Sequence, residues 1–227
     1  MASTSVRVIA SIASVHRRRR PTRDQRRGTA GTPAGEAQAL VSLGVIDRRQ
    51  GRYEQAADHL RQALTRYRAI GDRGGEARAL GNLGTVEWQL GRNDLAADHH
   101  QRALALFRSI GDRAGAARAL GNLGTVYEPL GRYAEAADHL RQAIAAYREI
   151  GDRSGEAAAR CNLGTVHQRQ GRDEAAAEHH RWALAFYREV GDRGSEADAL
   201  NDIGAALLAT GRPDLATDRH TAALALR

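Results

Sequence analysis

Three asparagines recur at 40-residue intervals in this 227-residue chain, at Asn82, Asn122 and Asn162. A carboxamide offers both a hydrogen-bond donor and an acceptor, so it can pair with a peptide group whatever side chain that peptide carries. Ser42 and Asp202 stand one further interval before and after the three. The spacing predicts a ladder of side chains suited to holding an extended peptide backbone. The alternative, which stays open at this point, is that the asparagines are only solvated.

Arginines and threonines flank this asparagine column. Arg78 and Arg118 precede Asn82 and Asn122 by four residues, which is about one helical turn. Because a guanidinium pairs bidentately with a carboxylate, we expect a ligand that carries at least one carboxylate. Further candidate peptide-binding residues follow the asparagines at Thr85, Thr125 and Thr165. A helical threonine hydroxyl often bonds to its own backbone, and that is the interpretation we favour for these three.

Two columns of histidines raise the question of a metal site. The first column is His59, His99, His139 and His179, and the second is His100, His180 and His220. A zinc ion needs several ligands within ~2 Å, whereas equivalent residues of successive copies are separated by another helix at ~8–10 Å per helix contact. The second column replaces Leu60 and Leu140, so we expect packed histidines. No metal site is predicted.

The sequence contains no recognisable catalytic constellation. All 34 basic residues are arginine, which excludes chemistry that needs a lysine ammonium group, such as a P-loop or a Schiff base. The motifs HExxH and GxSxG and a nucleotide-binding glycine loop are missing. Cys161 takes the place of Gly81 and Gly121, so we interpret it as a small packing residue rather than a reactive thiol. We therefore predict no enzymatic activity and no cofactor.

The elements that must position these side chains form an internal repeat. Gly-Asp-Arg opens four of the segments, and Gly-Arg marks the midpoint of all five: 31–70, 71–110, 111–150, 151–190 and 191–227. Each half carries one apolar stripe with helical spacing, so each copy is predicted to form two helices. Gly131 and Gly151 suit the left-handed residue that ends a helix, and Asp152 suits the N-cap of the next helix.

Neither helix of such a pair can bury its stripe alone, so neighbouring copies must stack. The predicted fold is an all-α, right-handed α-solenoid of about ten antiparallel helices in residues 31–227. An aromatic column is assigned to core packing rather than to base stacking: Tyr67, Phe107, Tyr147 and Tyr187. Pro129 predicts a kink or an early stop in its helix. Trp88 and Trp182, if exposed, are candidate partner anchors.

The third copy resembles the tetratricopeptide repeat. The residues that carry the resemblance are Leu120, Leu123-Gly124, Tyr127, Ala136, Leu140 and Ala143. The chain departs from the family in having Arg at the usual proline, at Arg68, Arg108, Arg148 and Arg188, and in six extra residues per copy. This longer form looks like the repeats of kinesin light chains and the C-terminal arrays of actinobacterial regulators.

The resemblance implies a non-enzymatic scaffold that binds an extended protein or peptide segment in a concave groove lined by first helices. It also implies that asparagines in the column of Asn82 grip the peptide backbone. Such a scaffold could form the sensor part of a signalling or transcriptional regulator.

The formal net charge of +7 belongs to the first 30 residues, which hold eight arginines and one acid, whereas residues 31–227 are neutral. We expect residues 1–30 to form a disordered arm. The favoured interpretation is a tail without a specific role. The alternatives are an address signal, a spurious start, or a segment through which the chain associates with nucleic acid. No apolar run is long enough for a membrane helix, and a cytoplasmic location is expected.

The last copy lacks a polar capping helix, which suggests a fragment of a larger protein. We expect an exposed apolar stripe around Ile203, Leu207, Ala216 and Leu224, through which the chain could self-associate.

Overall fold

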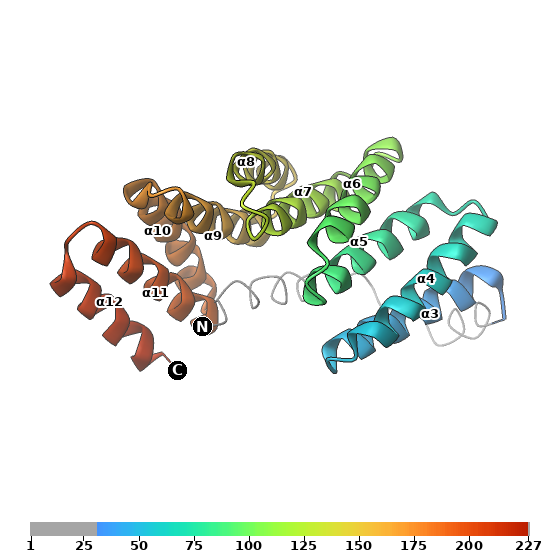
Figure 1. The fold of residues 1–227 in the computed structure, drawn as a ribbon, viewed down its shortest axis with the longest axis horizontal. Helices are drawn as coiled ribbons and strands as arrows, with labels where there is room; N and C mark the ends of the chain where they lie inside the picture. Colours follow the sequence, from blue (N-terminus) through green and yellow to red (C-terminus); the bar gives the residue numbers. More distant parts are fainter. Residues whose placement is uncertain (1–30, 227) are drawn as a thin grey trace. The chain divides into compact units, whose positions relative to one another are not determined.

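The computed structural model describes residues 31–226, which are helical apart from short joints (Figure 1). Within this range the helices are α3 (Pro33–Arg49), α4 (Tyr53–Ala69), α5 (Arg73–Gln89), α6 (Asn93–Ser109), α7 (Arg113–Tyr127), α8 (Tyr133–Glu149), α9 (Arg153–Arg169), α10 (Asp173–Val190), α11 (Arg193–Ala209) and α12 (Pro213–Ala225). The all-α class and the pairing of two helices per copy are confirmed. The arm predicted for residues 1–30 lies outside the described residues.

The helices fall into two compact units, residues 31–130 with α3 to α7 and residues 131–226 with α8 to α12. Inside each unit every helix packs on the next one along the chain. The first helices of successive copies also touch, since α3 contacts α5, α5 contacts α7, and α9 contacts α11. Equivalent side chains on these first helices therefore repeat on neighbouring helices of the same unit.

The joint between two copies uses one aspartate for two helices. Gly71 adopts a positive φ of 70°, and the backbone N–H of Asp72 then donates to the carbonyl of Tyr67 at 3.0 Å, which closes α4. The Asp72 carboxylate accepts the N–H of Gly75 at 2.8 Å and so caps α5. Asp112, Asp152 and Asp192 cap their helices in the same way, which confirms the predicted cap at Asp152.

The aromatic column lies in the core, as predicted, and its first three rings each rest on a glycine of the following helix. A Cβ on Gly75 would lie 2.2 Å from Cδ1 of Tyr67, and a Cβ on Gly115 would lie 2.3 Å from Cδ1 of Phe107. Gly155 meets Tyr147 in the same manner. The role of this glycine column was not predicted, although its 40-residue recurrence is visible in the sequence.

The second histidine column is packed inside the helix pairs, as predicted for His100 and His180. Both imidazoles are buried. A Cβ on Gly84 would lie 2.9 Å from His100, just as one on Gly44 would lie 2.8 Å from Leu60. Histidine and leucine therefore fill the same space in different copies.

Pro129 has the predicted effect on its helix. Helix α7 ends at Tyr127 after 15 residues, whereas α5 and α9 have 17. A proline lacks the N–H that would continue the helix, so the last half-turn is lost.

The expected exposed stripe in the last copy is wrong for three of its four residues. Ile203, Leu207 and Ala216 are buried in one apolar cluster formed by α9 to α12. They are covered because α11 packs between α10 and α12, and all three helices contribute to this cluster. Leu224 alone is exposed as expected.

Candidate peptide-binding surface

Asn82 on α5 and Asn122 on α7 occupy equivalent positions on two neighbouring helices of residues 31–130. Both side chains are partly exposed, and neither carboxamide hydrogen-bonds to another described residue. A half-buried carboxamide with unused donors and acceptors can accept a peptide group without first breaking an internal bond. Asn82 and Asn122 thus have the available donor and acceptor that the predicted ladder of peptide-binding side chains requires.

Arg78 and Arg118 are exposed one turn before the two asparagines. Each guanidinium group lies beside a residue of the aromatic column. The guanidinium carbon of Arg118 lies 5.9 Å from the centre of the Phe107 ring. Burial raises the pKa of the Tyr67 hydroxyl, and the charge of Arg78 beside it opposes that rise. Stacking on the Phe107 ring limits the freedom of Arg118 while its charge stays accessible to solvent. We call Arg78, Asn82, Arg118 and Asn122 the Asn/Arg surface.

The three threonine hydroxyls bond to their own helices. Thr85 donates to the carbonyl of Gly81 at 3.1 Å, Thr125 donates to Gly121 at 3.1 Å, and Thr165 donates to Cys161 at 3.3 Å. This is the interpretation favoured from the sequence. Each hydroxyl proton is used locally, so the threonines could only accept a bond from a ligand.

The equivalent positions in residues 131–226 carry a different charge. Asn162 lies on α9, but Ala158 and Asp198 stand in the column of Arg78 and Arg118. Asp202 stands in the asparagine column on α11, and its Oδ2 lies 3.8 Å from Nδ1 of His180. Burial, with Asp198 nearby, raises the pKa of Asp202 to about 7. This unit thus repeats the asparagine but not the positive charge.

Cys161 is buried beneath the asparagine column. Its burial, together with the carboxylate of Asp202, raises the pKa of the thiol to about 12. A thiol that is neutral and inaccessible is neither a nucleophile nor a ready metal ligand. The prediction of a small packing residue is confirmed.

The two tryptophans are not exposed anchors. Trp88 and Trp182 are both half-buried, and the guanidinium carbon of Arg160 covers the Trp182 ring at 4.3 Å. Arg160 stands in a column that is leucine in the other four copies, and its Nη2 also bonds to Oε1 of Glu156 at 2.9 Å. The copy that carries arginine in place of leucine thus also carries the tryptophan on which that arginine packs.

Three of the four arginines that replace the family's proline connect successive copies. Arg68 pairs with Glu76 at 2.7 Å, and Arg148 pairs with Glu156 at 2.8 Å. Arg188 pairs with Glu196 at 2.8 Å in the same geometry. Their contribution to the stacking of copies was not predicted from the sequence.

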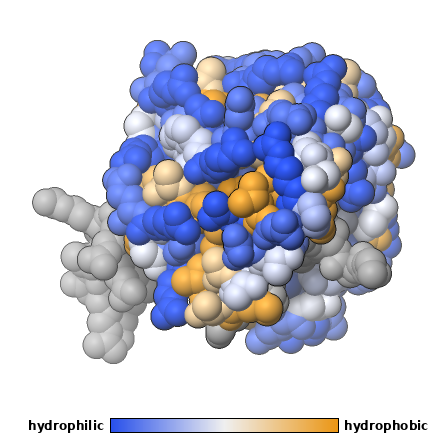
Figure 2. Space-filling view, turned by 90° about the vertical axis from the view of Figure 1, so that its left-hand side faces the viewer, coloured by the Kyte–Doolittle hydropathy of each residue, from blue (hydrophilic) through white to orange (hydrophobic). Residues whose placement is uncertain are grey.

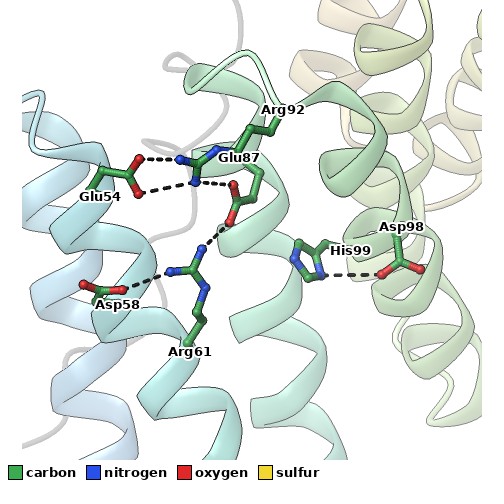
Figure 3. A network of polar contacts seen from close by, with 7 residues as sticks. All are labelled: Glu54, Asp58, Arg61, Glu87, Arg92, Asp98 and His99. Carbon is green, nitrogen blue, oxygen red and sulfur yellow. Dashed lines mark hydrogen bonds and ion pairs between the residues drawn. The ribbon is translucent and has the colours of Figure 1, made fainter.

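A second junction network surrounds the buried carboxylate of Glu87 on α5 (Figure 3). Arg61 on α4 donates to Oε1 at 2.8 Å, and Arg92 donates to Oε2 at 3.2 Å. Arg92 also reaches Glu54 of the preceding copy at 2.5 Å, and Arg61 also bonds to Asp58 at 2.9 Å. The network therefore connects the first two copies.

Neither a metal cluster nor a membrane span is found in the described part of the chain. No three His, Cys, Asp or Glu side chains within residues 31–226 are placed to share a metal ion. Over the same residues, no helix combines the length and the apolar character needed to cross a membrane.

A family model described as tetratricopeptide repeat matches residues 35–109, 75–149, 115–189 and 157–227. No curated protein matches the sequence significantly. Among solved structures, BtubC (BKLC) from P. vanneervenii is similar over 100% of this chain and 92% of its own, with a TM-score of 0.79 and 20% identity. The TPR-like repeats of a putative Podospora anserina kinesin light chain match over 86% of this chain and 96% of their own, with a TM-score of 0.71 and 15% identity.

A Rap protein complexed with competence and sporulation factor is also similar, with a TM-score of 0.73 and 18% identity over 86% of this chain and 56% of its own. At these identities the solved structures show the fold alone. The resemblance to kinesin light chain repeats that the sequence suggested is confirmed.

Proposed function

The chain belongs to the tetratricopeptide repeat family, and on that premise we propose that residues 31–130 bind an extended acidic segment of a partner protein on the Asn/Arg surface. The observation that carries the proposal is the repetition of one arrangement on α5 and α7. On each helix an exposed arginine precedes a half-buried, unpaired carboxamide by one turn. The chain would act as a non-enzymatic interaction scaffold.

The chemistry of the four residues specifies the ligand class. Asn82 and Asn122 can each pair with a backbone peptide group, which needs an extended segment because a helix uses its own backbone groups internally. Arg78 and Arg118 then favour carboxylates near that backbone. The Rap structure supports the proposal, since that similar fold was solved in complex with competence and sporulation factor. A ligand-dependent scaffold of this kind could form the sensor part of a signalling or transcriptional regulator.

A displayed library of random dodecapeptides tests the proposal on the full chain. We expect enrichment of peptides rich in Asp and Glu. The best of them, fluorescently labelled, should bind about tenfold more weakly to the Asn82→Ala/Asn122→Ala double variant. The Arg78→Ala/Arg118→Ala variant should also bind more weakly, and its affinity should depend less on salt.

The matched control is the Arg66→Ala/Arg102→Ala variant. It removes the same two charges from the second helices α4 and α6 of the same unit, where both arginines are exposed. Its affinity should stay close to that of the original chain. The proposal fails if no peptide is enriched, or if the double asparagine variant binds as tightly as the original while its helical circular dichroism is unchanged. Asn162→Ala reports whether residues 131–226 take part.

A further inference from the structure

Every internal junction between copies buries the same three columns of apolar side chains. On the second helices the column is Leu64, Leu104, Ile144 and Leu184, and all four are buried. On the following first helices one column is Leu83, Leu123, Leu163 and Ile203, and the next is Val86, Val126, Val166 and Ala206, and all of these are buried too. A second helix of one copy and the first helix of the next therefore form a standard apolar contact.

The outer face of α12 presents the first of these columns to solvent. Leu224 stands one interval after Leu184, but it is 71% exposed where Leu184 is 7% exposed. Thr217 is likewise exposed in the column where Ala177 is buried. Figure 2, which views the molecule from the side of α12, shows an apolar patch enclosed by polar residues. At the internal junctions, the equivalent face of a second helix packs against the first helix of the next copy.

The outer face of α3 presents the complementary columns. Leu43 is 45% exposed and Ile46 is 49% exposed, whereas Leu83 and Val86 at the equivalent positions of α5 are at most 1% exposed. Ala39 is exposed in a column that is buried in the other copies. Each copy that buries these positions follows the second helix of another copy. Among the described residues, the first copy does not follow such a helix.

The charges beside the two faces are also complementary. At the first internal junction, Glu54 at the start of α4 bonds to Arg92 in the next copy. Asp214 stands in the column of Glu54 at the start of α12, and Arg52 stands in the column of Arg92 next to α3. A chain placed with its α3 on the α12 of another would bring Asp214 and Arg52 together as an opposite-charge pair.

From these observations we propose that the chain associates head to tail with a second copy of itself, with α3 of one copy packing on α12 of the other. The two faces differ, so the interface is heterologous, and each added copy presents a free face at either end. Assembly is therefore an open series rather than a closed dimer. One helix-pair face is small, so the expected affinity is weak, with a dissociation constant of about micromolar order.

Sedimentation velocity of the full chain over a concentration series tests the proposal with two single variants. Leu224→Arg blocks only the α12 face, and Ile46→Arg blocks only the α3 face. Each variant alone should associate at least about tenfold more weakly than the original chain. Their equimolar mixture should form a one-to-one heterodimer that does not grow further, because the first variant keeps an intact α3 face and the second keeps an intact α12 face.

Leu95→Arg is the matched control, since Leu95 is a half-exposed leucine on α6 and belongs to neither end face. It should associate like the original chain. The proposal is overturned if the original chain is monomeric at every concentration, as it would be if another segment of the chain covered either face. It is equally overturned if Leu224→Arg abolishes association while Ile46→Arg does not, because that pattern indicates a symmetric contact between two α12 helices.

Discussion

The imidazole of His180 on α10 fills the space beside Gly164 on α9, where a Cβ would stand 2.5 Å from Nε2. The same relationship exists between His100 and Gly84 in residues 31–130. Two helices of a copy can approach this closely only where one of them lacks a side chain. The glycine and its bulky neighbour therefore act as one unit of the core.

The Gly164→Ala variant should be destabilised by about 1–3 kcal/mol, because the methyl group must displace a buried ring that has no free space to enter. Urea unfolding followed by circular dichroism measures the change. Gly81→Ala is the control, since a Cβ on this helical glycine meets nothing within 4 Å. It should be neutral or stabilising by up to about 1 kcal/mol. Equal effects of the two variants would contradict the close contact.

Acid should destabilise the chain partly through His100. Burial, with His99 beside it, lowers the pKa of His100 to about 3 in the folded state, whereas an unfolded histidine titrates near 6.5. Below pH 6.5 the unfolded state binds a proton that the folded state does not. The free energy of unfolding therefore decreases progressively as pH falls from 6.5 towards 3.

Replacing His100 with Leu removes the pH dependence that comes from this imidazole. Leu60 shows that leucine fits beside the equivalent Gly44. The free energy of unfolding of His100→Leu should therefore fall less steeply than that of the original chain between pH 7 and pH 5. Urea titrations at several pH values give both slopes. Identical slopes would show that the imidazole is not buried in its neutral form.

Removing the partners of Glu87 should cost more stability than removing Glu87 itself. In the Arg61→Ala/Arg92→Ala variant a buried carboxylate loses both cations, which should cost about 3 kcal/mol. Glu87→Leu should change the free energy of unfolding by no more than about 1 kcal/mol, because Leu207 is buried at the equivalent position of the last copy. The triple variant completes the cycle and should recover most of the loss. A triple variant as unstable as the double arginine variant would contradict this account.

Local rules decided most of the fold, which is why it could be predicted from the sequence. The helical stripes, the glycines at the joints and the cap at Asp152 each depend on residues within one turn. Pro129 acts on its own helix for the same reason. Features that depend on two helices were harder to predict. The contact of Gly75 with Tyr67 joins α5 to α4, and the sequence of neither helix alone predicts it.

The candidate surface was predicted in part. The 40-residue interval located Asn82 and Asn122 at equivalent positions of first helices. It could do so because copies with similar sequences fold into similar helix pairs. It could not show that Arg118 stacks on Phe107 or that Arg78 lies beside the Tyr67 hydroxyl, since these contacts depend on how α7 packs on α6 and α5 on α4. The burial of Ile203 was missed for a similar reason, because it depends on the packing of α11 against α10 rather than on either helix alone.

The double use of Asp72 leaves no spare residue at the joint between copies. Because its N–H ends one helix and its carboxylate starts the next, one inserted residue would turn α5 by about 100° about its own axis relative to α4. That rotation would carry Leu83 and Val86 out of the interface and put the polar residues Asn82 and Thr85 in their place. The helices of this chain are thus held in rotational phase with each other, and the insertion or loss of a whole 40-residue copy preserves that phase.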